Sequence, residues 1–307
     1  MIRMPGASYH GQLPALTQEQ LALEQDLRTS VQRLAGDIGE RNLFRYQRLV
    51  AAAEYIRTTL ARFDYIIGRH CYEVAGKASE NLEVEIQGTQ RPEEIIVTGA
   101  HYDSVAGSPG ANDNGTGVAA LLALARESVG TQPARTLRFV AFTNEEPPFF
   151  QTKSMGSHVY ATRSRQRDER IVLMLSLETL GYYSDSPGSQ SYPFPFSLFY
   201  PSTANFIAFV SNTNNAAWVR RLVESFRRHA QFPSEGGALW SGIPGVAWSD
   251  HWAFWQQGYP AVMVTDTAPN RYPYYHTAAD TPEKVHYDRL ARVVSGLGDV
   301  IREVANE

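Results

Sequence analysis

Short apolar segments of strand length alternate with amphipathic helical patterns along most of this chain. Residues 171–177 are almost continuously apolar, as expected of a strand that is buried on both faces of a sheet. Residues 117–127 place apolar side chains on one helical face, and residues 290–301 repeat that pattern. Strands and helices that alternate in this way favour an α/β sandwich with a mostly parallel central sheet.

The same periodicities predict further elements. Strands are expected at 82–86, 94–100, 135–143 and 261–265. A capping box at Thr17 predicts a helix that ends near Gly36, and residues 49–60 have the spacing of a second helix. We therefore expect five strands, counting residues 171–177, with helices before and between them.

We expect residues 1–307 to form a single domain, because neither an internal repeat nor a low-complexity linker divides them. In this prediction residues 1–65 are N-terminal helices that pack on the domain. Residues 182–248 are rich in Pro, Ser, Gly, Asn and aromatics, with one helix near 216–230. Long irregular segments are usually functional loops, so residues 182–248 are predicted to form a lid or wall over a site.

Composition narrows the classes of function and of partner. The formal net charge of −4 lacks the basic excess of a nucleic-acid-binding protein. No segment is apolar and long enough to span a membrane. The protein is expected to be cytoplasmic if Met1 is the native start, and exported or envelope-associated if the chain has been trimmed. Because Cys71 is the one cysteine, any metal must be held by histidines and carboxylates.

Polar side chains follow the predicted strands at the points where these strands end. His101 follows the second predicted strand, Glu145 and Glu146 follow the third, and Glu178 follows the fourth. Sites in α/β sheets form at the carboxyl ends of strands, so these side chains are expected to converge. Asp113 lies in a glycine-rich loop that opens a helix, where glycines let the backbone pack close to such a site.

The spacing within these segments is consistent with a pair of metal ions. His101 and Asp103 point the same way in an extended chain, so Asp103 can accept the second ring N–H of a metal-bound His101. Glu145 and Glu146 point in opposite directions, so one can bind metal while the other faces substrate and water. Asp113 can bridge two ions about 3.5–4 Å apart.

Five motifs carry these residues. They are His101-Tyr102-Asp103-Ser104, Asn112-Asp113-Asn114-Gly115, Asn144-Glu145-Glu146, Leu177-Glu178 and Tyr275-His276-Thr277. In order and spacing they resemble the M28 family of zinc peptidases, which includes aminopeptidases and glutaminyl cyclases, over roughly residues 81–300. The resemblance implies a three-layer α/β/α sandwich, in which helices flank a mixed, mostly parallel twisted sheet.

The resemblance also implies a ligand set. His101 and Glu178 would hold one Zn²⁺, Glu146 and His276 would hold a second, and Asp113 would bridge them. Two zinc ions per chain are therefore expected. Glu178 stands where many aminopeptidases of the family have Asp, which keeps the charge on a longer side chain.

Further roles carry over from the same family. Glu145 would be the general base, and Tyr275 matches a tyrosine that in some relatives donates a hydrogen bond to the oxyanion. Asp250 and His251 lie in a Ser-Asp-His motif that resembles one near the substrate pocket, so they are candidates for contact with substrate or support of the ligands. The activity implied is hydrolysis of amide bonds, most simply release of N-terminal residues from peptide or aminoacyl substrates.

Two other functions stay open at this point. A glutaminyl-peptide cyclotransferase would use a related site with a single zinc, so metal stoichiometry separates it from a two-zinc aminopeptidase. A non-catalytic binding or receptor-like member would lack ligands, whereas all five and the base are present here. The sequence leaves the oligomeric state and the preferred N-terminal residue undetermined.

Overall fold

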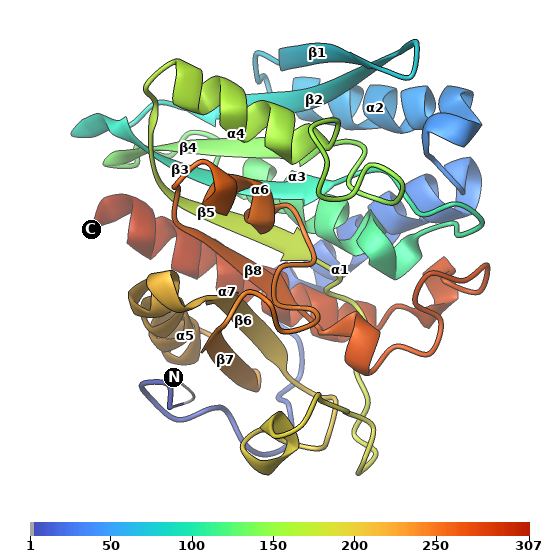
Figure 1. The fold of residues 1–307 in the computed structure, drawn as a ribbon. Coiled ribbons are helices and arrows are strands. Elements are labelled where there is room, and N and C mark those ends of the chain that lie inside the picture. Colours follow the sequence, from blue (N-terminus) through green and yellow to red (C-terminus); the bar gives the residue numbers. More distant parts are fainter. Residues whose placement is uncertain (1–2) are drawn as a thin grey trace.

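An eight-stranded mixed sheet forms the centre of the molecule in a computed structural model that describes residues 3–307 (Figure 1). The strands are β1 (Gly68–Val74), β2 (Lys77–Ile86), β3 (Arg91–His101), β4 (Arg135–Phe142), β5 (Arg170–Glu178), β6 (Ile207–Asn212), β7 (Ser234–Leu239) and β8 (Ala261–Thr265). Their order is β1-β2-β4-β3-β5-β8-β6-β7. The central strands β4, β3, β5 and β8 are parallel neighbours, whereas β2 and β6 join them antiparallel. The predicted mixed, mostly parallel sheet is confirmed.

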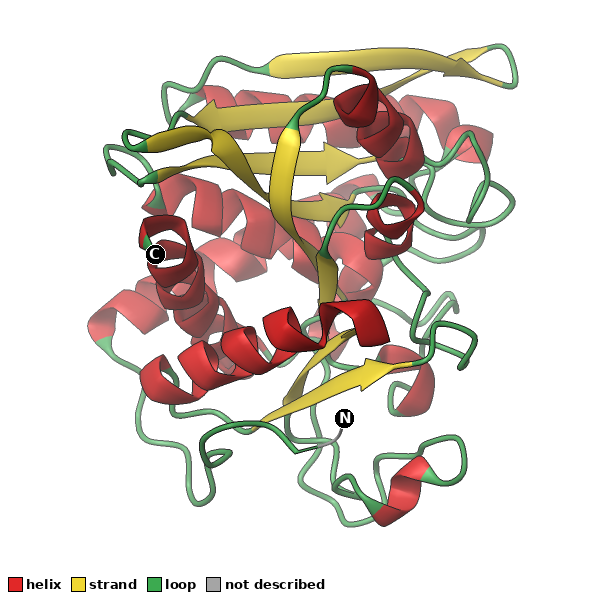
Figure 2. Ribbon diagram, turned by 60° about the vertical axis from the view of Figure 1, so that its left-hand side comes forward, coloured by secondary structure: helices red, strands yellow, loops and turns green. Residues whose placement is uncertain are grey.

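Helices cover both faces of this sheet, so the predicted three-layer α/β/α sandwich is also confirmed (Figures 1 and 2). The helices are α1 (Gln18–Val31), α2 (Tyr46–Ala61), α3 (Gly117–Glu127), α4 (Gly156–Gln166), α5 (Ala216–His229), α6 (His251–Gln256) and α7 (Tyr287–Asn306). Helices α1, α2, α3, α5 and α7 share one side, where α1 packs on α3 and α7. Helices α4 and α6 pack together on the other side. A large apolar core lies under the first group and a smaller one under the second.

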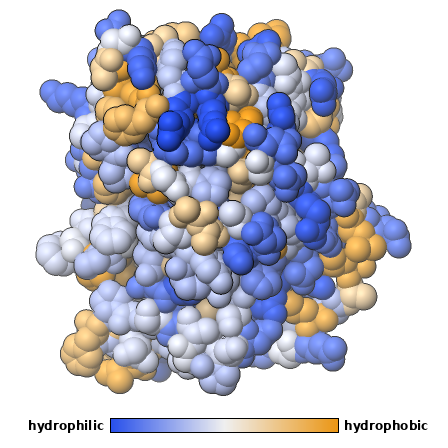
Figure 3. Space-filling model, turned by 90° about the vertical axis from the view of Figure 1, so that its right-hand side faces the viewer, coloured by the Kyte–Doolittle hydropathy of each residue, from blue (hydrophilic) through white to orange (hydrophobic). Residues whose placement is uncertain are grey.

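The parallel strands end at one edge of the sheet. His101 at the end of β3 is in register with Phe142 at the end of β4, and Glu178 at the end of β5 is in register with Thr265 at the end of β8. In Figure 1, β5 runs toward the right-hand side of the molecule. Figure 3 views that side and shows mixed hydropathy, with hydrophobic side chains gathered in separate patches. Residues that follow these strands therefore meet on one face.

The segment 182–248 differs from its prediction as a loop-rich lid. Besides α5 it contributes β6 and β7, which extend the sheet beyond β8. Strand β7 has the sequence Ser-Glu-Gly-Gly-Ala-Leu, whose adjacent glycines weaken any strand signal. Pairing with β6 and packing of α5 hold it in the sheet. Strand β1 and helices α4 and α6 were likewise not predicted.

The residues before α1 run along α5 and β7 as an N-terminal arm, here defined as residues 3–14 (Figure 1). Arg220 donates to the carbonyl of Arg3, and Arg227 donates to the carbonyls of Pro5 and Gly6. Ser8 accepts a hydrogen bond at its hydroxyl from the backbone of β7. The arm thus lies beside the edge strand of the sheet.

Within residues 3–307, none of the helices combines the length and the apolar character that crossing a membrane requires.

Candidate metal centre and adjoining pocket

Six side chains, from segments far apart in the sequence, converge where the parallel strands end. His101 is the last residue of β3 and Glu178 the last residue of β5. Glu145 and Glu146 lie just beyond β4. Asp113 precedes α3 and His276 lies in the loop after β8; they complete the cluster, named here the metal centre (Glu145 and the five predicted ligands).

The geometry divides the predicted ligands into two groups that share Asp113. One group is His101, Asp113 and Glu178, and the other is Asp113, Glu146 and His276; in each the ligand atoms lie within 4.8 Å of one another. The two oxygens of Asp113 face different histidines: Oδ1 lies 3.4 Å from Nε2 of His101, and Oδ2 lies 3.1 Å from Nε2 of His276. Asp113 therefore stands between two candidate cation positions.

Each position is completed by a glutamate. Oε2 of Glu178 lies 3.2 Å from Nε2 of His101, and Oε2 of Glu146 lies 3.4 Å from Nε2 of His276. Glu145 lies slightly farther away, with Oε2 at 3.8 Å from Nε2 of His101. It is thus placed beside the ligand set, as expected of a group that handles a proton.

The donors of this centre fit divalent zinc. His101 is buried, and within residues 3–307 neither of its ring nitrogens has a hydrogen-bond partner. A buried imidazole without partners is costly in the absence of a cation to bind. Imidazole nitrogens and carboxylate oxygens, without a thiolate, are the donors used in co-catalytic zinc sites.

The electrostatics indicate a centre with too much negative charge for its degree of burial. Burial, reinforced by neighbouring carboxylates, raises the pKa of Glu145 and of Glu146 well above the ordinary range, and burial also raises the pKa of Glu178. Burial would lower the pKa of His101, but the charges of Glu145 and Glu178 outweigh it and raise that pKa. In contrast, the nearby imidazoles of His101 and His276 outweigh burial and lower the pKa of Asp113. Cations in the two positions would offset this excess.

Asp103 contacts the ligands differently from the prediction. Its Oδ1 lies 3.6 Å from Nδ1 of His101, which is longer than a hydrogen bond. Each oxygen instead accepts a backbone N–H, Oδ1 from Glu145 at 3.2 Å and Oδ2 from Glu146 at 3.1 Å. Because the chain turns sharply after β4, both amides point back at the end of β3. Asp103 therefore fixes the backbone of the two glutamates.

Left-handed backbone recurs around the centre. Asn144, Thr179 and His276 have φ of 56°, 47° and 57°, a region that side chains other than glycine seldom occupy. Asn144 immediately precedes Glu145, and Thr179 immediately follows Glu178. Such conformations persist where surrounding structure enforces them, and they cluster at functional sites.

Asp280 and Ser249 support the ligands but were not predicted to do so. Asp280 accepts the backbone N–H groups of Asn112 and Asp113 and the hydroxyl of Tyr272, which anchors the Asp113 loop. The hydroxyl of Ser249 donates to Oε2 of Glu178 at 2.7 Å. Ser249 opens the Ser-Asp-His motif, which was the one available signal for it.

Arg41 is a buried cation beneath the metal centre, and no sequence motif predicted its role. Its guanidinium donates to the backbone carbonyls of Tyr102, Pro109 and Gly110, among others. Burial lowers the pKa of Arg41 to about 10, so it stays charged at neutral pH. Arg41 therefore ties together the segments that carry His101 and Asp113.

Asp250 and His251 are adjacent in sequence but have different surroundings. Asp250 is buried beside the centre, where burial raises its pKa to about 7. His251 faces away, since its Nε2 lies 2.8 Å from the carbonyl of Val246, and burial lowers its pKa to about 4. Neutral His251 thus stabilises the loop around Val246.

Tyr275 stacks on His276 with ring centroids 3.9 Å apart, and burial next to the carboxylates raises the pKa of Tyr275.

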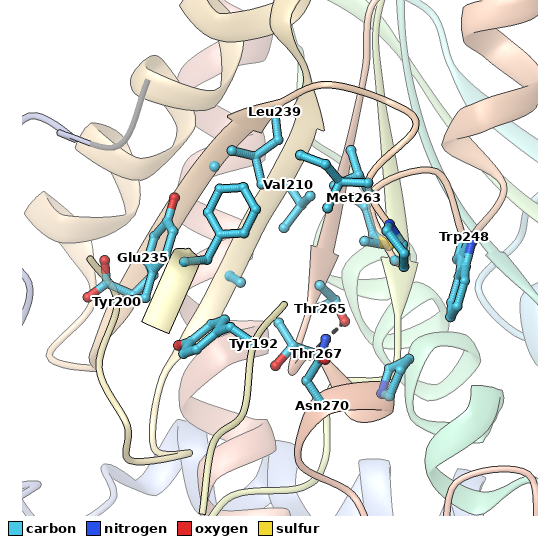
Figure 4. Close-up of a pocket in the computed structure, with 18 of the residues that line it drawn as sticks. Tyr192, Tyr200, Val210, Glu235, Leu239, Trp248, Met263, Thr265, Thr267 and Asn270 are labelled. Carbon is cyan, nitrogen blue, oxygen red and sulfur yellow. Dashed lines mark hydrogen bonds between the residues drawn. The ribbon is translucent and has the colours of Figure 1, made fainter. Parts of the chain in front are cut away.

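An apolar pocket adjoins the centre (Figure 4). Glu178 and Tyr275 line it on the side of the metal centre. Its other walls come from β6, β7 and β8 and from the loops around Tyr192 and Trp248. Most of its aromatic side chains belong to the segment 182–248, part of which is sheet.

Comparisons with known proteins place this architecture in a family. The profile of Peptidase family M28 matches residues 81–301, so the chain belongs to this family of zinc peptidases. It is 34% identical over 290 residues to the protein YfbL of Escherichia coli, whose name describes it as uncharacterized; the match covers 90% of this chain and 87% of YfbL.

Two aminopeptidases of Bacillus subtilis also match. Aminopeptidase YwaD is 26% identical over 224 residues, and the match covers 71% of this chain but 42% of YwaD, so the chain spans less than half of that relative. BSAP, a zinc aminopeptidase, superposes with a TM-score of 0.73 at 15% identity, covering 92% of this chain and 95% of BSAP. At that identity the likeness establishes the fold.

Proposed function

We propose that this peptidase is an aminopeptidase, which releases N-terminal residues from peptides through a two-zinc centre. The observation that carries the proposal is the placement of Asp113, whose two oxygens face His101 and His276. One carboxylate between two histidine–glutamate pairs is the arrangement that a bridging ligand requires.

The chain's own residues account for the proton transfers. Zinc held by His101, Asp113, Glu146, Glu178 and His276 would supply Lewis-acid chemistry, polarising a carbonyl and lowering the pKa of water toward roughly 7. Glu145 would accept a proton from the attacking water and return it to the leaving amine, since its Oε2 lies beside the ligand set, 3.8 Å from Nε2 of His101. Tyr275, which stacks on His276, would donate its hydroxyl hydrogen to the oxyanion; burial raises the pKa of this phenol, which therefore keeps its proton.

The pocket supports cleavage at the N-terminal end of a peptide. Because Glu178 belongs to the centre and lines the pocket together with Tyr275, the side chain of a residue whose carbonyl lies beside Glu145 would enter the pocket. The carboxylate of Glu178, which lines the pocket beside the centre, would offer negative charge to the α-ammonium group of an N-terminal residue. The names of YwaD and BSAP as aminopeptidases support this assignment.

Replacement of Glu145 by Gln tests the proposal. The variant keeps the size of the side chain but removes the base, so we expect kcat on aminoacyl-anilides to fall by about 10²–10⁴-fold. Zinc content, measured by atomic absorption, should stay at two per chain if the ions bind the two groups that share Asp113. Glu145 lies outside both, but it forms a third group with His101 and Glu146, so a loss of zinc would identify it as a ligand. Near wild-type turnover would refute the role of Glu145.

Metal stoichiometry tests the two-zinc centre separately. One tightly bound zinc per chain, together with cyclisation of N-terminal Gln peptides, would favour the cyclotransferase function. Blocking the peptide N-terminus by acetylation should abolish cleavage by an aminopeptidase, and retained cleavage would indicate an endopeptidase.

A further inference from the structure

The inner wall of the pocket carries an acidic side chain. Alternate residues of a strand face opposite sides of a sheet. On β6, Phe209 packs against Phe226 of α5, and on β7 a Cβ built at Gly236 would meet Val223 of α5. Their neighbours in sequence therefore face the pocket, among them Glu235 and Gly237.

Glu235 lies at the far end of the pocket, together with two tyrosines. Figure 4 places Glu235, Tyr192 and Tyr200 on one side, across the pocket from Trp248. The two phenol rings stack with centroids 5.6 Å apart. Burial, and after it the charge of Glu235, raises the pKa of Tyr200 to about 12, so the phenol keeps its proton.

The polar atoms at this end are acceptors of hydrogen bonds. Tyr200 donates its hydroxyl hydrogen to the carbonyl of Gly236, and Tyr192 donates to the carbonyl of Pro201. Their oxygen lone pairs, and both oxygens of an ionised Glu235, remain to accept further bonds. A ligand group placed there must supply the hydrogens.

Glu235 has spare capacity to accept them. Among residues 3–307 its carboxylate receives no hydrogen bond, and its nearest cation is the guanidinium of Arg227 at 3.9 Å. Arg227 already donates to Ser234 and to the carbonyls of Pro5 and Gly6 in the N-terminal arm. It balances part of the charge but occupies neither oxygen of Glu235 at hydrogen-bond distance.

We propose that Glu235 makes the pocket select N-terminal lysine or arginine. The long methylene stem would lie along the aromatic and aliphatic walls, among them Phe196 and Phe206, and the cationic tip would reach Glu235 and the phenol oxygens. This inference rests on the proposed aminopeptidase function, since it assigns the side chain that enters the pocket.

The test uses pairs of aminoacyl-anilide substrates that differ at the end of the amino-acid side chain. Norleucine is lysine without the ammonium group, and citrulline is a neutral analogue of arginine. For the wild-type enzyme we expect kcat/KM to be about tenfold higher for lysine than for norleucine, and for arginine than for citrulline, as one charge-assisted hydrogen bond predicts. The difference should lie mainly in KM and should shrink in high salt.

The variant Glu235→Gln keeps the shape of the side chain without its charge, and we expect it to lower the lysine-to-norleucine ratio about tenfold. The matched control is Glu224→Gln on the exposed side of α5, which changes the net charge equally and should leave the ratio unchanged. The wild-type ratios test the proposal even if Glu235→Gln does not fold.

Two outcomes would overturn the role of Glu235. One is equal hydrolysis of lysine and norleucine anilides by the wild type. The other is a preference for lysine that Glu235→Gln leaves intact. Failure to hydrolyse any anilide, norleucine included, would instead count against the aminopeptidase function itself.

Discussion

Asp250 shows how much the metal centre depends on its charge at the scale of a single residue. Its side chain is fully buried, and neither oxygen has a hydrogen-bond partner within residues 3–307. Burial is the main reason that its pKa is raised to about 7, and the charge of His101 only partly counters it. An ionised carboxylate in this position is unfavourable unless cations lie nearby.

The pH dependence of stability follows from that raised pKa. In zinc-free protein Asp250 titrates near 3.8 when unfolded and near 7 when folded, so the folded state binds the extra proton. Its contribution to stability is complete below about pH 3.8 and is lost as pH rises through about 7. Asp250→Asn cannot ionise, so it should be more stable than wild type at pH 8, by at most about 4 kcal/mol, with little difference at pH 4.

Urea unfolding in EDTA at pH 4, 6 and 8 measures this difference, with the exposed Asp64→Asn as a control that should give a pH-independent offset. A constant difference between Asp250→Asn and wild type would contradict the prediction.

At the scale of elements, periodicity predicted those segments whose own residues determine their structure. Helix α3 and strand β8 have the predicted bounds, because each buries a continuous apolar face. Strand β7 was missed since Gly236 and Gly237 contribute no side-chain signal and its pairing with β6 is a tertiary contact. Helix α6 has six residues, too few for a helical repeat to be recognised.

The residues of the candidate site also fall into two groups, those that the sequence could predict and those that it could not. His101 and Glu178 were placed because they end strands, a position that the sequence reveals. Asp280 and Arg41 act on backbone groups more than 60 residues away, so no local pattern could assign them. Glu235 lies in the strand that periodicity missed, and its position facing the pocket was hidden for the same reason.

The junction between β4 and α4 tolerates no side chain at Gly156. A Cβ there would lie 2.3 Å from the carbonyl oxygen of Thr143 and 2.4 Å from Oδ1 of Asn81. We expect Gly156→Ala to lower the free energy of unfolding by roughly 1–3 kcal/mol and, because Glu145 and Glu146 follow Thr143, to speed loss of zinc to a chelator. Gly76→Ala, in an open turn, should cost about 1 kcal/mol and leave zinc loss unchanged. Equal zinc loss from both variants would contradict this prediction.

At the scale of the whole molecule, the metal centre joins distant parts of the chain. Its residues lie between His101 and His276 in the sequence. They belong to the ends of β3 and β5 and to the loops before α3, after β4 and after β8. Zinc bound there would link β3, β4, β5 and the loop after β8, and it would offset carboxylates whose pKa is raised by burial. We therefore expect folding and metal binding to be coupled.

Removal of zinc should lower Tm by roughly 5–15 °C at pH 8, the loss expected for a tightly bound ligand of a chain this long. The loss should be smaller at pH 5.5, because protons on the raised-pKa glutamates compete with the metal. Scanning calorimetry with EDTA, and with zinc restored, measures both values. A Tm that does not respond to EDTA would contradict the coupling.

The N-terminal arm is held mainly through its backbone carbonyls, with the hydroxyl of Ser8 as one side-chain contact. Arg220 and Arg227 bind the carbonyls of Arg3, Pro5 and Gly6, and none of these bonds reads a side chain of the arm. Apart from positions whose side chains make contacts, such as Ser8 and Met4, its residues can change as long as the path of the backbone is kept. A deletion that shifts the register would free the arginines and uncover the rim of the sheet, so the arm tolerates substitution far better than a change of length.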